Sequence, residues 1–178
     1  MKILMGLDLG TTAMKIALFD EQGKSLAFST QEYDLLTPQT NYVEEKPEVY
    51  WKAFQDGIAD LRSQYFLSEV TEIAMAMSAQ GETLFVLDRE GNPLRNAIVW
   101  MDNRAIEEAK ELEERFGNDV CYQKTGQVSF EACWPASKIL WIRKHEPEVF
   151  AEADKFLLIE DYFIYRLTGK YTTEPSLV

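Results

Sequence analysis

The sequence contains few of the residues that build metal centres and disulfide frameworks. It has two cysteines, Cys121 and Cys133, and one histidine, His145, among 178 residues. The cysteines lack the spacing of a zinc site, and a single histidine adds little to one. Cysteines used so sparingly are typical of a reducing compartment, where they pack as small, buried or half-buried side chains. The sequence therefore argues against a zinc centre and against a disulfide-linked fold.

Basic residues and long apolar runs are scarce as well. The chain has 18 Lys and Arg against 30 Asp and Glu, which gives a formal net charge of −12. A surface of that sign repels phosphate backbones, so nucleic acid is not an expected partner. No apolar run approaches the roughly 18 residues of a membrane span, and Asp8 interrupts the first run too early for a secretory signal. We expect a cytoplasmic protein with no membrane or nucleic-acid partner.

The first 19 residues carry the most informative pattern. An apolar run ends at Asp8, a tight Gly10-Thr11-Thr12 turn follows, and a second apolar run begins after Lys15. The pattern predicts two strands joined by a turn. Gly10 permits a bend whose N–H groups can hold phosphate oxygens, and the Asp8 carboxylate can hold Mg²⁺ directly or through water. The same residues also suit an ordinary hairpin, in which Asp, Gly and Thr serve only the turn.

Apolar periodicity divides the rest of the chain into strands first and helices later. We expect strands at 26–33, 42–44, 73–77, 83–88, 97–100 and 156–158, of which 73–77 is typical of a buried strand. We expect helices at 47–65, 103–116, 135–144, 147–151 and 159–167. Pro47 suits a first helical turn, and Gly117 and Gly169 suit positions just after helix ends. Strands in hairpins followed by helices and returning strands predict an α/β fold with a mixed sheet.

Six groups of residues occur in the order in which one known family carries them. They are Asp8-Leu9-Gly10-Thr11-Thr12 with Lys15; Val43-Glu44 before Pro47 and Trp51; Ser78-Ala79-Gln80-Gly81-Glu82-Thr83; Asn96-Ala97-Ile98-Val99-Trp100-Met101-Asp102-Asn103-Arg104; Thr125-Gly126 with Pro135-Ala136-Ser137-Lys138-Ile139-Leu140-Trp141-Ile142; and Leu167-Thr168-Gly169-Lys170-Tyr171. Together they resemble the N-terminal domain of the FGGY carbohydrate kinases, the family of glycerol, xylulose and gluconate kinases. The resemblance covers the whole chain.

The resemblance implies an actin-like ATPase (ribonuclease H-like) α/β domain, with a mixed sheet and flanking helices. The family transfers the γ-phosphoryl group of ATP to a hydroxyl of an open-chain sugar or polyol, with Mg²⁺, between two domains. Residues 1–178 would form a truncated N-terminal domain, since a fresh extended segment begins at 171, and the C-terminal nucleotide-binding domain would be absent. We expect this fragment alone to be inactive. Family members are often dimeric, which suggests a homodimer.

The resemblance also gives roles to particular residues. Asp8 would lie near Mg²⁺, and Gly10, Thr11 and Thr12 would face the β- and γ-phosphates, with Lys15 either adding charge or exposed to solvent. The candidate sugar contacts are Gln80, Gly81, Glu82, Asp102 and Arg104, because carboxylates and guanidinium groups can satisfy adjacent hydroxyls.

Structural roles compete with some of these assignments. Asp102 can instead cap the following helix while Arg104 pairs with a surface acid. We expect Trp100 to end a buried strand, and Lys138 and Trp141 to pack a helix beneath the site.

Two departures from the family pattern bear on the substrate and the base. Glycerol kinases carry Gln-Arg-Glu where this chain has Gln80-Gly81-Glu82, so a xylulose-like or gluconate-like substrate is expected rather than glycerol. The family's Thr-Asp-x-Ser run, which we take to hold the catalytic base, corresponds to Thr173-Glu174-Pro175-Ser176. Glu174 is therefore the candidate base, and a base elsewhere or an inactive homologue are the alternatives. The rival from another class is a non-catalytic actin-fold module for sugar sensing or assembly.

Overall fold

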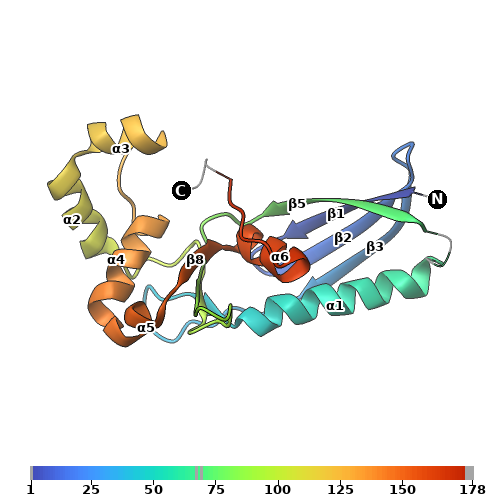
Figure 1. Ribbon diagram of the computed structural model, residues 1–178, viewed down its shortest axis with the longest axis horizontal. Helices are drawn as coiled ribbons and strands as arrows, with labels where there is room; N and C mark the ends of the chain where they lie inside the picture. The colour runs from blue at the N-terminus through green and yellow to red at the C-terminus, as the bar shows by residue number, and fades with distance from the viewer. Residues whose placement is uncertain (1, 67, 69, 175–178) are drawn as a thin grey trace. The chain divides into compact units, whose positions relative to one another are not determined.

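The chain folds as two compact units, each built around its own sheet. The computed structural model describes residues 2–66, 68 and 70–174 (Figure 1). One unit comprises Met1–Asp34 and Pro47–Gln80, and the other comprises Leu35–Lys46 and Gly81–Val178.

A four-stranded mixed sheet forms the first unit. Its strands are β1 (Lys2–Leu9), β2 (Ala13–Phe19), β3 (Ser25–Glu32) and β5 (Glu72–Ala79), in the order β3-β2-β1-β5. β1, β2 and β3 form an antiparallel meander, whereas β5 runs parallel to β1. Parallel pairing requires a crossover connection, and this connection contains helix α1 (Pro47–Gln64). The register places Asp8 opposite Lys15 on β2 and opposite Ser78 on β5.

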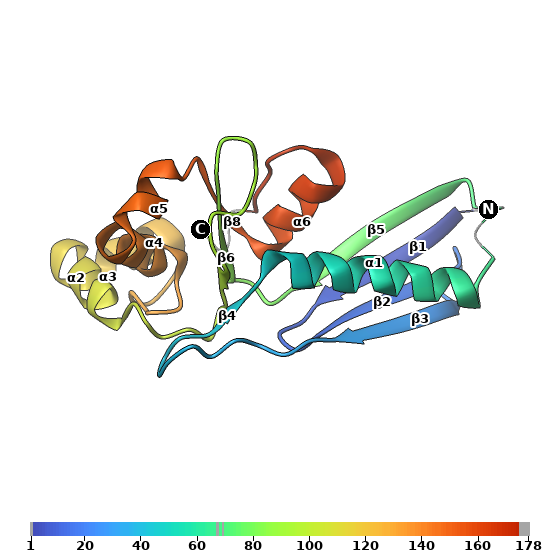
Figure 2. The same cartoon turned by 90° about the horizontal axis from the view of Figure 1, so that it is seen from below.

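The core of the first unit lies between the sheet and α1, which packs along β2 and β3 (Figure 2). Alternate residues of β1 and β2 point into this core, as the period of a strand requires. The buried side chains are Ile3, Met5, Leu7, Leu9, Met14, Ile16 and Leu18. Gly57 lets the helix approach closely, because a Cβ at this position would lie 2.8 Å from Cδ1 of Ile16.

The prediction that the strand at 73–77 is buried was wrong. Ile73 and Met75 are 45% and 38% exposed. The reason is topological: β5 is the last strand at one edge of its sheet, whereas α1 packs against β2 and β3, toward the opposite edge. Apolar composition identified the strand but could not show whether anything covers it.

A four-stranded antiparallel sheet organises the second unit. Its strands are β4 (Glu44–Glu45), β6 (Leu84–Leu87), β7 (Ala97–Ile98) and β8 (Lys155–Leu158), in the order β4-β7-β6-β8. The helices are α2 (Ile106–Phe116), α3 (Asn118–Thr125), α4 (Pro135–His145), α5 (Pro147–Glu152) and α6 (Ile159–Thr168). The core of this unit is Leu84, Val86, Ile98, Ala105, Trp141, Ile142 and Leu158.

Most predicted elements are present with ends shifted by a few residues, and the α/β class with a mixed sheet is confirmed. Three details differ. Helix α3 was not predicted, the helix expected from 103 begins at Ile106, and Trp100 is 38% exposed instead of ending a buried strand. β7 already ends at Ile98, so Trp100 lies beyond the ladder. Cys121 is buried and Cys133 half-buried, and both are free thiols, as expected. Among the helices described, none is long and apolar enough to cross a membrane.

Candidate functional site

The turn between β1 and β2 is closed in a way that requires glycine. The Gly10 N–H donates to the Ala13 carbonyl at 3.1 Å. A Cβ at Gly10 would lie 2.6 Å from that same carbonyl oxygen, so a larger residue would force the turn open. Tyr33 anchors the turn from β3's end: its hydroxyl donates to the Gly10 carbonyl at 2.5 Å and its N–H donates to the Thr12 carbonyl at 3.0 Å. The turn is therefore fixed before any ligand binds.

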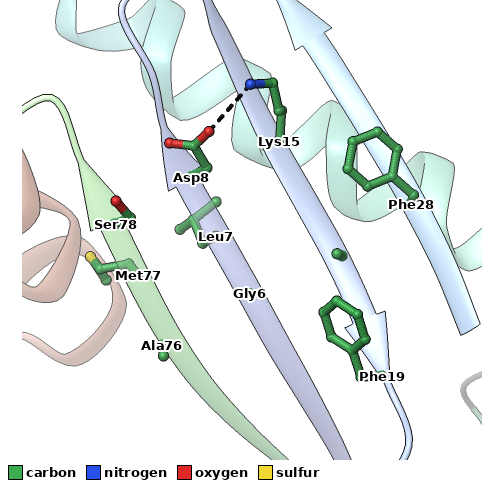
Figure 3. A pocket seen from close by; sticks show the side chains of 10 residues that line it. Gly6, Leu7, Asp8, Lys15, Phe19, Phe28, Ala76, Met77 and Ser78 are labelled. Carbon is green, nitrogen blue, oxygen red and sulfur yellow. Dashed lines mark hydrogen bonds and ion pairs between the residues drawn. The ribbon is translucent and has the colours of Figure 1, made fainter. Parts of the chain in front are cut away.

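Asp8 and Lys15 face each other across the two strands that lead into this turn (Figure 3). Lys15 Nζ lies 3.4 Å from Asp8 Oδ2, and the two side chains are 51% and 47% exposed. A pair so long and so exposed stabilises the fold very little. Beside it is an open hollow of about 500 Å³, partly lined by small residues. The Asp8 carboxylate thus remains accessible.

An accessible carboxylate fits a magnesium ion better than it fits most other metals. Among residues 2–66, 68 and 70–174, no group of three or more His, Cys, Asp and Glu side chains could hold a metal ion. Mg²⁺ suits a site with few protein ligands, since it keeps several waters and is commonly held by one or two carboxylates together with substrate phosphates. Asp8 fits such a site, and its role as a magnesium ligand stays a prediction.

Gln80, Gly81 and Glu82 lie where the chain passes from the first unit to the second. Gln80 Nε2 donates to the Tyr50 hydroxyl at 3.3 Å, and its Oε1 is buried without a partner in the described chain. Gly81 has a φ of 74°, a conformation that favours glycine. The Glu82 carbonyl accepts a hydrogen bond from Lys138 at 2.7 Å.

Asp102 and Arg104 are buried together and bind each other. Arg104 Nε lies 2.9 Å from Asp102 Oδ1, and its terminal nitrogen lies 2.8 Å from Oδ2. Asp102 Oδ2 also accepts the Val43 N–H at 2.6 Å. Rings of Tyr42 and Trp141 flank the guanidinium, with centroids 3.9 and 4.9 Å from its central carbon. The geometry gives these two residues a scaffold role, and direct contact with a sugar stays a prediction for them.

Sequence reasoning missed the group that completes this cluster. Glu44 Oε1 accepts bonds from Arg95 at 2.5 Å and from Arg104 at 2.7 Å, and its Oε2 accepts one from Asn96 at 3.0 Å. Arg95 also pairs with Glu146 at 2.7 Å. The alternative role for Arg104, pairing with a surface acid, was wrong: its partners are Asp102, which is buried, and Glu44, which is partly buried. Burial alone would lower the pKa of Arg104, but its bonds with Asp102 and Glu44 raise that pKa above the ordinary value.

Lys138 and Trp141 are buried in α4, in agreement with the packing role expected for them. Burial lowers the pKa of Lys138 from 10.5 to about 8, against the opposing charges of Asp102, Cys133 and Glu82.

The candidate base Glu174 is exposed and is the last residue described, so Pro175 and Ser176 of its motif lie outside the described residues. Its negative charge raises the pKa values of Glu160 and Asp161, after the larger effect of burial on each. The charge of Glu82 also raises the pKa of Glu160. The Oε2 atom of Glu160 is buried and has no hydrogen-bond partner among the described residues. Glu82 and Glu174 therefore both act on the same carboxyl group.

Residues 3–178 match the model of the FGGY family of carbohydrate kinases, N-terminal domain. The chain belongs to this family. The xylulose kinase of Escherichia coli K12 is 35% identical over 172 residues, which is 97% of this chain and 34% of that protein. The glycerol kinase of Thermococcus gammatolerans is 32% identical over 179 residues, 98% of this chain and 36% of that protein.

Solved structures agree with the family assignment. The gluconate kinase of Lactobacillus acidophilus superposes with a TM-score of 0.86 at 34% identity, over 96% of this chain and 34% of that one. The fold is therefore that of an actin-like ATPase, as the sequence motifs implied. The chain spans about a third of the length of the relatives that it matches.

Proposed function

We propose that the full-length protein transfers the γ-phosphoryl group of ATP to a hydroxyl of an open-chain sugar or polyol. The observation that supports this most directly is the preformed Gly10 turn with an accessible carboxylate, Asp8, at its base, in a chain of the FGGY kinase family. Phosphoryl transfer needs phosphate neutralisation and positioning more than covalent help. The turn would position the phosphates, and Asp8 would hold the Mg²⁺ that neutralises them.

The proposal assigns the phosphate end of the reaction to the first unit. Asp8 holds Mg²⁺, and the bound ion supplies positive charge to the phosphates. Gly10 shapes the turn through its bond to the Ala13 carbonyl, and the backbone N–H groups and hydroxyls of Thr11 and Thr12 face the β- and γ-phosphates. Lys15 adds a further positive charge on the neighbouring strand, close enough to screen the Asp8 carboxylate. A cytoplasmic location and a homodimer accompany this proposal as predictions.

The proposal assigns the sugar end to Gln80, Gly81 and Glu82. Family membership alone does not choose the sugar, since named relatives include xylulose, gluconate and glycerol kinases. Gly81 is the feature that favours a xylulose-like or gluconate-like substrate, because glycerol kinases carry an arginine there. The positive φ of Gly81 supports this choice: an arginine at this position would be strained in the conformation that this chain adopts.

The test is a coupled assay on the full-length protein with ATP, Mg²⁺ and a panel that includes xylulose, gluconate and glycerol. Asp8→Asn is expected to lower kcat by roughly 100-fold or more, because it removes the carboxylate that would hold Mg²⁺, the ion whose positive charge the phosphates require. Asp56→Asn is the control, since Asp56 lies on the exposed face of α1 and pairs with Lys52. Full activity of the Asp8 variant would contradict the assignment.

The base and the rival class are tested in the same experiment. If Glu174 accepts the hydroxyl proton, Glu174→Gln lowers kcat by roughly 100-fold or more with little change in the KM for sugar; an active variant puts the base elsewhere. A sensor or assembly module would transfer phosphate to no sugar of the panel. A sugar sensor would still bind one, and a ligand at 100 times its Kd stabilises a protein by about 2.7 kcal/mol.

A further inference from the structure

Lys138 is fully buried, which is rare for a lysine. Its ammonium group donates to the carbonyl oxygens of Glu82 at 2.7 Å and Val99 at 3.2 Å. Asp102, the acid whose charge favours the ammonium most, is already engaged by Arg104 and by the Val43 N–H. Two carbonyl acceptors offset only part of the cost of burying a charge. Packing alone therefore does not account for a lysine here.

The two carbonyls belong to the two segments that carry the candidate sugar contacts. Glu82 lies two residues before β6, and Val99 follows β7 and leads into the run that contains Asp102 and Arg104. The ladder between β6 and β7 pairs Leu84 with Ile98. Beyond this pair, the segments are joined by the bond from the Trp100 N–H to Thr83 Oγ1 and by the Lys138 ammonium. Lys138 thus joins the two segments just beyond the point where the hydrogen-bonded ladder of β6 and β7 ends.

We propose that Lys138 is a positioning residue for the sugar, which holds Glu82 and the 99–104 segment at the spacing that substrate binding requires. The inference rests on the proposed function, since this spacing matters only if a sugar binds there. Lys138 has no exposed surface and acts through Glu82 and Val99. Its contacts lie within the second unit, so the phosphate turn of the first unit does not depend on them.

The charges around Lys138 predict how the bridge responds to pH. The titratable and charged groups that face it are Asp102, Glu82 and, once ionised, the Cys133 thiol, which favour the ammonium, and Arg104, which disfavours it; burial raises the pKa of the Cys133 thiol. Burial outweighs them and brings the pKa of Lys138 to about 8. Bonds from an ammonium are stronger than bonds from a neutral amine. The bridge therefore weakens as the pH rises through about 8.

The variant Lys138→Met tests the proposal in the full-length protein. It is expected to raise the KM for sugar by roughly 10- to 100-fold, because small displacements of binding groups are costly, while the KM for ATP changes by less than about twofold. Lys144→Met is the matched control on the same helix: Lys144 is partly exposed and pairs with acids of α2, away from Glu82 and Val99. It should leave both KM values unchanged.

Three outcomes separate the alternatives. A Lys138→Met protein that binds sugar normally, or that loses sugar and ATP binding equally with a lower Tm, overturns the positioning role while the kinase assignment stands. If this variant does not fold, the wild-type protein decides: its KM for sugar should rise as the pH passes about 8 with its KM for ATP steady, and a flat KM for sugar overturns the proposal. A wild-type protein that phosphorylates no sugar overturns the proposed function itself.

Discussion

At the scale of single residues, Glu160 opposes folding at neutral pH. Burial, with the negative charges of Asp161, Glu174 and Glu82, raises the pKa of Glu160 from 4.5 to about 7. An acid whose pKa is higher in the folded state than in the unfolded state stabilises the fold in its protonated form. This stabilisation is complete below the unfolded value of 4.5 and is lost as the pH rises through about 7.

Glu160→Gln removes this titration while keeping the size of the side chain. We expect the variant to melt roughly 2–4 °C above the wild type at about pH 8, where the wild-type carboxyl is ionised, and level with it near about pH 4. Calorimetry at the two pH values measures the difference. Glu152→Gln, at the exposed end of α5, should shift Tm at neither pH. An equal gain for Glu160→Gln at both pH values would show that titration is not its cause.

At the scale of elements, the carboxylate of Glu44 on β4 forms hydrogen bonds and ion pairs with the segments that flank β7 and precede α2. Its carboxylate accepts bonds from Arg95, Asn96 and Arg104, and all three belong to the second unit. Glu44→Gln removes the charge that two buried guanidinium groups share. We expect a loss of at least about 2 kcal/mol in the free energy of unfolding, because breaking a buried ion pair leaves uncompensated charge.

Chemical denaturation of the Glu44 variant measures this loss. Asp56→Asn is the control: its pair with Lys52 on α1 is exposed and joins residues four apart, so the change should stay within about 0.5 kcal/mol. Equal effects of the two substitutions would mean that the buried cluster contributes no more than a surface pair.

Elements defined by local chemistry were predictable from the sequence. β1, the Gly10 turn and β2 follow from alternation and one glycine, and α1 follows from Pro47 and helical periodicity. Each of these signals acts within a few positions. The position of the turn in the candidate site was therefore predicted, whereas the use of the Gly10 N–H in a bond to the Ala13 carbonyl was not.

Features that depend on distant neighbours were not predictable. Helix α3 buries only Cys121, so its apolar pattern is weak; the one marker was Gly126, which adopts the left-handed conformation after its last residue. The partners of Arg104 and Asp102 include Glu44 and Val43, 60 and 59 positions away. Spacing along the chain carries no information about such pairs.

At the scale of the whole molecule, the family assignment came from the order of the motifs and not from any one of them. Asp8 and the Gly10 turn belong to the first unit, and Glu82, Asp102 and Arg104 to the second. Each motif alone has a structural explanation, as the burial of Asp102 and Arg104 illustrates. Their common order along the chain is what suggests a role in phosphate binding for the turn and in sugar binding for the segment.

The edge strand β5 bears on whether the whole chain associates with other copies of itself. Its apolar residues are open to solvent, with Ile73 45% and Met75 38% exposed, and edge strands with such residues pair readily with other chains. We expect the 178-residue chain to self-associate as its concentration rises, and Met75→Lys to weaken this association, because a lysine on an edge strand opposes pairing. Sedimentation velocity over a concentration series measures both.

The control must be an apolar residue that is exposed but not on a strand. Val128 is 77% exposed and lies between α3 and α4, so Val128→Lys adds the same charge without changing an edge. If exposure alone drives association, Val128→Lys should reduce it at least as much as Met75→Lys does, since Val128 is the more exposed of the two. If strand pairing drives it, only Met75→Lys should act. Association that survives Met75→Lys unchanged would run through another surface, which would contradict the role given to β5.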